Sequence, residues 1–190
     1  MPNQDHTGFR PATGAQPKRL VLRFPVTTSN GTNLFVGDAV RPESAGGVTP
    51  LDAGATVNDV ALGVVVALFD SNGIPVGGAE SSVSTKYLGS STAGYADIDC
   101  CVPGAVFIGQ AQTGTTYAAT DVFAGVNIVA GTGSTTTANS GHELGATGGT
   151  DCILLGLVND PNNAFGSENA DMYFSFLTSF WGQVNPTGGV

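Results

Sequence analysis

Short runs in which apolar and polar residues alternate recur along this chain, and they predict strands rather than helices. Residues 18–26 (KRLVLRFPV) place Leu20, Leu22 and Phe24 on one face of an extended segment. Pro25 lacks a backbone donor, so this strand ends there or lies at a sheet edge. No amphipathic helical pattern of ten or more residues occurs, and the predicted fold class is therefore all-β.

Further strands are predicted where apolar residues cluster between turn signals. The run at 60–69 is rich in β-branched residues and stops at Asp70-Ser71-Asn72-Gly73, which favours a strand and a tight turn. The remaining expected strands are a short return at 74–76, two short strands within 95–109 separated by Pro103-Gly104, and residues 34–40, 126–129, 152–158 and 171–180.

The last of these strands alternates cleanly, because Met172, Phe174 and Phe176 point to one face. Five aromatic residues occur from Tyr173 to Trp181, both ends included. One interpretation is that these aromatic residues form half of the protein's own core. The other is that the far face, with Trp181 beyond it, meets another subunit.

Two segments of the chain echo each other. In each, a strand that contains a polar residue (37–40, 125–129) is followed by an apolar strand that contains glycine (62–65, 155–158). Such spacing is typical of a small supersecondary unit, and two units are expected to pair their apolar strands into one barrel or sandwich.

The predicted domain organisation is one body between two polar ends. Residues 1–17 are expected to form a flexible or extended arm, residues 18–182 a single β-rich body, and residues 183–190 a mobile tail. The body is expected to be a small β-barrel, β-tulip or sandwich with long Gly/Thr-rich loops, of which residues 131–149 are the longest.

Charge is scarce and unevenly placed. Charged residues make up 11% of the chain, against about 25% in ordinary soluble domains. The net charge is −9, and residues 87–190 hold eight acidic residues with no Lys or Arg. An acidic body disfavours nucleic-acid and anionic-membrane partners. No apolar run approaches the length of a membrane span, and no signal peptide is evident, so synthesis in a reducing cytoplasm is expected.

Candidate chemistry is weak. His142 with Glu143 is interpreted as a solvated pair on a flexible loop. Asp97 and Asp99 share one strand face, and either they or the oxygen-rich segment 160–171 offer at most part of a calcium site. Three cysteines without a CxxC pair favour neither a disulfide scaffold nor a zinc site. No GxxxxGK[ST], GxSxG or HExxH motif occurs, so neither an enzyme, a cofactor nor a bound metal is expected.

Several segments resemble the capsid decoration, or cement, proteins of tailed bacteriophages. The resembling segments are residues 35–40, 61–65, 117–122, 127–130, 154–163 and 169–176. The resemblance implies a β-barrel or β-tulip body on the outer surface of an icosahedral virion capsid. It implies that the protein bridges and stabilises major capsid protein subunits, and that it self-associates, with a homotrimer expected.

The resemblance also suggests which residues meet the capsid or a neighbouring copy. The candidates are Phe9, Arg10, Lys18, Arg19, Arg23 and Trp181. Under this hypothesis the basic stretch 10–23 meets an acidic surface, and deletion of residues 1–17 abolishes capsid binding without unfolding the monomer. The alternatives are another phage virion component (a coat, tail or fibre subunit) and a carbohydrate-binding module that stacks Tyr87, Tyr95 or Trp181 on sugars.

Overall fold

A computed structural model gives the structure of this protein. It describes residues 8–12, 19–28, 31–44, 46–51, 60–177 and 179–181. The predicted mobile tail at 183–190 lies outside the described residues.

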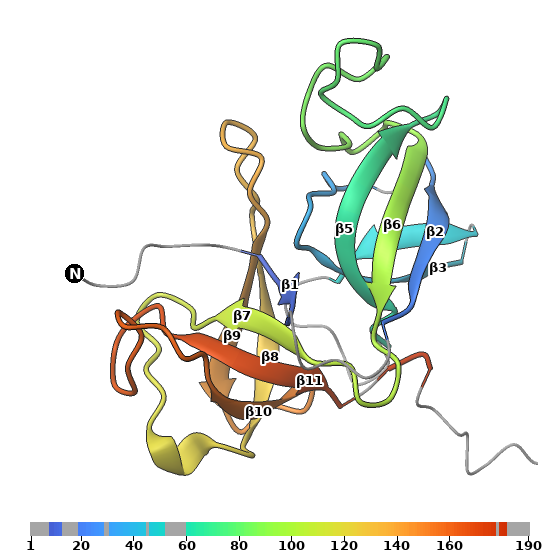
Figure 1. Ribbon diagram of the computed structural model, residues 1–190. Helices are drawn as coiled ribbons and strands as arrows, with labels where there is room; N and C mark the ends of the chain where they lie inside the picture. The colour runs from blue at the N-terminus through green and yellow to red at the C-terminus, as the bar shows by residue number, and fades with distance from the viewer. Residues whose placement is uncertain are drawn as a thin grey trace, which may run out of the picture.

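The chain forms two antiparallel sheets, which Figure 1 shows as two layers set at an angle to each other. The six-stranded sheet has the spatial order β1 (Arg10–Pro11), β7 (Phe107–Gln110), β11 (Asp171–Phe176), β10 (Cys152–Leu157), β8 (Gly125–Gly131), β9 (Gly141–Thr147). The five-stranded sheet has the order β2 (Val21–Val26), β6 (Gly94–Cys100), β5 (Gly63–Asp70), β3 (Ala39–Glu43), β4 (Gly47–Pro50).

The prediction of an all-β fold is confirmed. Within the described residues the only helical segment is one 3₁₀ turn, η1 (Ala119–Asp121). Of the body types expected, a closed barrel is not formed by the described strands, because neither sheet joins its two edges by a ladder. In the six-stranded sheet the ends approach at a single parallel bridge between Ala111 and Leu144.

The two sheets share one strand topology. Strands β2 to β6 are arranged as 2-6-5-3-4, and strands β7 to β11 are arranged as 7-11-10-8-9, with every neighbouring pair antiparallel. The chain therefore contains two consecutive five-stranded units of the same design. β1 is an additional strand on the edge of the second unit.

This repetition refines the echo seen in the sequence. The echoing strands are neighbours within each sheet, β3 beside β5 and β8 beside β10. The two apolar strands do not pair with each other as expected, since they belong to different sheets. The structural alignment of the two units also differs from the alignment suggested by the sequence echo. The pair Val40–Gly63 in the first sheet is equivalent to the pair Val126–Cys152 in the second.

Each sheet packs on its own cluster of buried apolar side chains. The inward positions expected for the last strand are confirmed, since Met172, Phe174 and Phe176 are all buried. They lie in the larger cluster with Phe9, Phe107 and Tyr117. The smaller cluster lies under β2, β5 and β6 and includes Leu34, Leu68 and Ile98.

The two units also contact each other directly. The larger cluster takes in Ala39, Leu51 and Val64, which belong to the first unit. After β11 the chain returns to that unit, where Ser179 bridges Ala61 in parallel and the backbone amide of Phe180 donates to the Ala61 carbonyl at 2.9 Å.

Three local expectations are corrected. The strand expected over 34–40 begins only at Ala39, because Gly37 has a φ of +95° and forms a turn. The loop expected over 131–149 contains β9, which pairs with β8 in a hairpin. Residues 8–12 of the expected arm lie against the protein's own body, where Arg10 pairs with Ile108 of β7.

Candidate functional site

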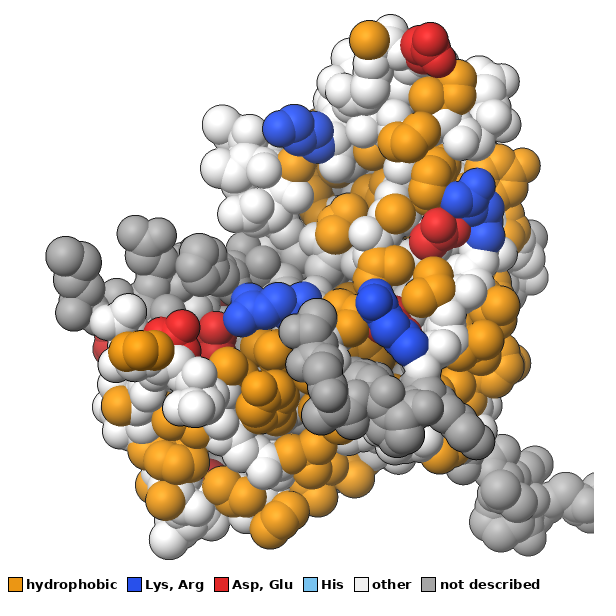
Figure 2. Space-filling view, viewed as in Figure 1, with side chains coloured by type: hydrophobic (Ala, Val, Ile, Leu, Met, Phe, Trp, Pro, Cys, Tyr) orange, Lys and Arg blue, Asp and Glu red, His pale blue; other side chains and the backbone are white. Residues whose placement is uncertain are grey.

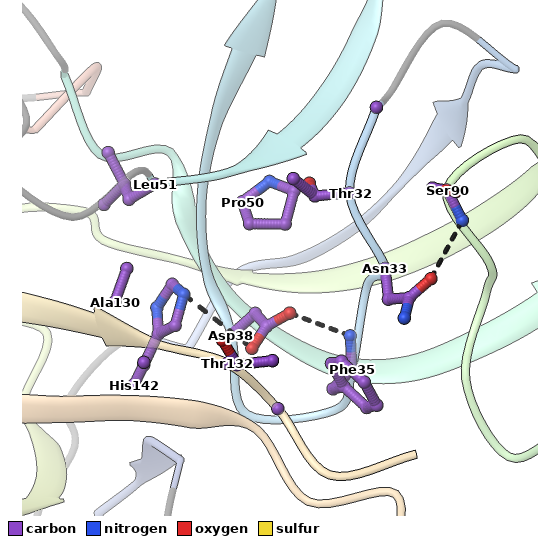
Figure 3. Close-up of a pocket in the computed structure, with 13 residues that line it drawn as sticks. Thr32, Asn33, Phe35, Asp38, Pro50, Leu51, Ser90, Ala130, Thr132 and His142 are labelled. Atoms are coloured by element: carbon purple, nitrogen blue, oxygen red, sulfur yellow. Dashed lines mark hydrogen bonds and ion pairs between the residues drawn. The ribbon is translucent and has the colours of Figure 1, made fainter.

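A cavity of about 410 Å³ opens where the two units meet. The first unit lines it with the segment before β3, the end of β4 and Ser90, and the second unit lines it with the β8–β9 hairpin. Figure 3 shows Asp38 and His142 facing each other among the residues that line this cavity, with Asn33 joined to Ser90 by a hydrogen bond. The lining residues are Gly31, Thr32, Asn33, Phe35, Asp38, Pro50, Leu51, Ser90, Ala130, Gly131, Thr132, Gly133 and His142.

His142 is the histidine interpreted from the sequence as solvated, and that interpretation is wrong. It lies on β9 and is 3% exposed. Its Nδ1 accepts a hydrogen bond from the backbone amide of Ala39 at 3.0 Å. Because Nδ1 is an acceptor, the ring proton of the neutral imidazole belongs on Nε2, and the side chain joins β9 to the start of β3.

Asp38 faces the other nitrogen of this ring. The distance from His142 Nε2 to Asp38 Oδ1 is 3.9 Å, and both side chains are buried. The Oδ2 atom of Asp38 accepts the backbone amide of Phe35 at 2.8 Å. Burial raises the pKa of Asp38, and the electrostatic interaction with His142 and hydrogen bonds from Ser140 and Phe35 partly oppose that rise.

The cavity contains one histidine, one carboxylate and several hydroxyl or amide groups. The pair formed by His142 and Asp38, here called the dyad, accepts hydrogen bonds from two backbone amides: Ala39 donates to His142 and Phe35 donates to Asp38. Among the described residues no group of three or more His, Cys, Asp or Glu side chains is placed to hold a metal ion. The arrangement positions β9 against the segment before β3, with Nε2 of His142 facing Oδ1 of Asp38 while the Phe35 amide donates to Oδ2.

The arginines predicted to meet a partner are paired within the chain. Arg10 contacts Asp171 at 2.9 Å, Arg19 contacts Asp99 at 2.6 Å, and Arg23 contacts Asp97 at 2.7 Å. Lys18 lies outside the described residues. Figure 2 shows Lys and Arg side chains on one face of the molecule, several of them beside acidic side chains. The expected shared face of Asp97 and Asp99 is confirmed, and both carboxylates are occupied by arginine.

The two aromatic candidates contribute to the protein's own core. Phe9 is 3% exposed, and its ring centroid lies 4.9 Å from that of Phe174. Trp181 packs against both hydrophobic clusters, and its Nε1 donates to the carbonyl of Leu62 at 3.2 Å. Trp181 therefore binds the segment after β11 to the first unit.

Other apolar side chains remain at the surface, and most of them were not singled out from the sequence. Phe123 is 72% exposed and has a φ of +71°, while Phe180 and Leu177 are just over half exposed. The others are Val21, Leu22, Val36, Tyr95 and Phe165. Alternation along β2 placed Leu22 on an inward face, but only the tertiary structure shows that this face is incompletely covered.

No family model, curated protein or solved structure matches this chain. The described residues include no helix long and apolar enough to cross a membrane.

Proposed function

We propose that this protein is a structural component of a tailed-bacteriophage virion. It binds the outer surface of the icosahedral capsid and stabilises the shell by bridging major capsid protein subunits. The observation that supports this proposal most directly is the surface, which carries large exposed apolar side chains on a chain with 11% charged residues. Exposed apolar side chains among uncharged polar ones are typical of surfaces that become buried in an assembly.

The ion pairs within the chain argue against an electrostatic attraction between the arginines and the capsid. Because Arg10, Arg19 and Arg23 are each neutralised by a carboxylate, this flank offers little net positive charge to an acidic capsid surface. The binding free energy comes instead from apolar burial and from backbone hydrogen bonds at sheet edges. Several weak contacts on one molecule are sufficient, since bridging two shell subunits adds avidity.

The test is co-sedimentation of the purified protein with expanded capsids that lack their decoration protein. Saturable binding in a fixed proportion to the major capsid protein subunits is expected, and it supports bridging of the shell. Binding that persists at high salt supports the apolar mode, because screening weakens exposed charge contacts. Absence of binding to every capsid offered contradicts the proposal, and glycan binding in its place favours a carbohydrate-binding module.

The structure favours a shorter N-terminal deletion than residues 1–17 as a test of capsid binding. Deletion of residues 1–17 removes Phe9 from the core and β1 from the sheet, so lost binding would not be separable from lost stability. Deletion of residues 1–7 retains both features. The matched surface variants are Leu177→Asp, at an exposed apolar position, and Thr135→Asp, at an exposed polar position. We expect Leu177→Asp to weaken capsid binding and Thr135→Asp to leave it unchanged.

A further inference from the structure

The two units can be superposed residue by residue through their pairing registers. In the first unit Leu22 lies opposite Ile98, which lies opposite Val65 next to a bulge. In the second unit Phe107 lies opposite Phe174, which lies opposite Leu154 next to a bulge. Leu22 of β2 is therefore equivalent to Phe107 of β7, and these two strands occupy the same edge of their units.

In the second unit that edge is covered. Phe107 and Gly109 of β7 and Ala105 just before it form the inward row, and all three are buried. The covering strand is β1, whose residues Arg10 and Pro11 pair with Ile108 and Phe107. Its neighbour Phe9 lies so close over Gly109 that a Cβ there would be 2.8 Å from the ring.

In the first unit no strand among the described residues pairs with the same edge. The equivalent inward row is Leu20, Leu22 and Phe24, and none of these side chains is fully buried. Leu22 is 36% exposed, whereas its equivalent Phe107 is 1% exposed. The neighbouring Val21 is 43% exposed, so apolar surface lies on both faces of the free edge.

The backbone of this edge is placed to accept another strand. The amide of Cys100 donates to the carbonyl of Leu20 at 2.8 Å, so alternate residues from Leu20 onward use their backbone groups toward β6. The amides and carbonyls of Val21 and Arg23 consequently point outward. The free edge ends at Pro25, which has no amide and whose carbonyl faces Gly47 of β4.

We propose that this edge pairs with the same edge of a second copy of the chain, antiparallel and about a two-fold axis. Val21 of each copy then lies opposite Arg23 of the other, which forms about four backbone hydrogen bonds. Leu22 faces Leu22 of the second copy across the axis, and Leu20 faces Phe24. The exposed apolar row of each copy thus packs against the same row of the second copy, which runs in the opposite direction.

Charge favours this occupant as well. Arg23 is held by both carboxylate oxygens of Asp97, and its guanidinium lies 3.8 Å from the centre of the Phe69 ring. Each copy therefore brings a balanced pair to the contact, and the two arginines do not repel each other as free cations would. This contact does not depend on the capsid, and it can hold or fail independently of the proposed function.

The first test removes an outward donor without disturbing the sheet. Val21→Pro deletes an amide that does not bond to β6, and Pro25 already occupies an equivalent outward position in the same strand. Val21→Thr retains the amide and is the matched control. Sedimentation velocity over a range of concentrations should show a dimer for the native protein and Val21→Thr. For Val21→Pro the dissociation constant should rise about tenfold or more.

The second test traps the dimer. Across the axis Leu22 forms a non-hydrogen-bonded pair with its own copy, at a Cα separation of about 4.5 Å that a disulfide can span. Mild oxidation of Leu22→Cys should yield a covalent dimer, whereas Thr135→Cys, at an exposed distant position, should not. A native protein that stays monomeric, a trimer insensitive to Val21→Pro, or equal cross-linking of the two cysteine variants would overturn the proposal.

Discussion

His142 and Asp38 meet across the junction of the two units, with Nε2 and Oδ1 3.9 Å apart and both side chains buried. The histidine also accepts the backbone amide of Ala39, so this single ring contacts a carboxylate and the first residue of β3. The dyad therefore links β9 of the second unit to the first unit.

Replacing His142 by alanine should destabilise the protein. The change leaves the buried amide of Ala39 without an acceptor and removes the edge contact between the imidazole and the Phe9 ring. An unsatisfied buried donor costs about 1–3 kcal/mol, so we expect a loss of about 2–4 kcal/mol in the free energy of unfolding once the cavity is included. Urea denaturation measures the loss. Thr135→Ala in the same hairpin should change stability by less than about 0.5 kcal/mol.

Asp70 should make stability depend on pH in the acid range. Its Oδ1 accepts the amides of Asn72 and Ile74, and its Oδ2 accepts the amide and hydroxyl of Ser82. These bonds hold the pKa of Asp70 well below its usual value. The stabilisation is therefore complete above the unfolded pKa of about 3.9 and is lost as the pH falls through the lower folded pKa.

Thermal melts of the native protein and Asp70→Asn at several pH values test this linkage. The variant should melt at a lower temperature near neutral pH, and the difference should shrink as the pH falls below about 4. A difference that stays constant down to the lowest pH would contradict the linkage.

The three cysteines should resist thiol reagents in the folded protein. All three are buried free thiols, and burial raises the pKa of Cys100 to about 11 and that of Cys101 to about 12. Since the thiolate is the reactive form, an aromatic disulfide reagent at mildly alkaline pH should react negligibly with the native chain. In denaturant it should titrate all 3 thiols. Rapid labelling of the native protein would show that the interior opens locally.

Trp181 should stabilise the junction and report on it. Its indole contacts both hydrophobic clusters and donates to Leu62, and it is the only tryptophan of the chain. Trp181→Ala should lower the free energy of unfolding by about 2–4 kcal/mol, because the ring is partly buried. The exposed neighbour Phe180 provides the comparison, and Phe180→Ala should cost less. Equal costs would show that the indole does not join the clusters.

The ion pairs of the first unit should differ in strength. Arg23→Met breaks a contact to the partly exposed Asp97 and should cost about 0–1 kcal/mol. Arg19→Met leaves the buried Asp99 carboxylate without its cation and should cost more, about 1–3 kcal/mol. Denaturation at low and high salt separates the two, since screening affects the exposed pair more. The opposite ranking would contradict the assigned burial.

Local pattern was sufficient for the elements that depend on local chemistry. Alternation in 171–176 placed Met172, Phe174 and Phe176 inside, because side chains alternate across any strand. Pro25 marked an edge strand for an equally local reason, since a missing amide cannot serve a central ladder. The position of the β3 start was missed because the turn at Gly37 is stabilised by the Asp38 carboxylate, whose role depends on a partner far along the chain.

The sequence by itself determined that this chain forms sheets, where several of the strands lie, among them residues 171–176, and that charged residues are scarce. These properties follow from periodicity and composition, which act at short range. Only the tertiary structure decided which strands are neighbours, that β1 covers the edge of one unit while no described strand pairs with the equivalent edge of the other, and that His142 is buried beside Asp38. The physical reason is that strand pairing, burial and charge neutralisation depend on contacts between residues distant in the chain. Local pattern in a single sequence does not show which distant residues meet.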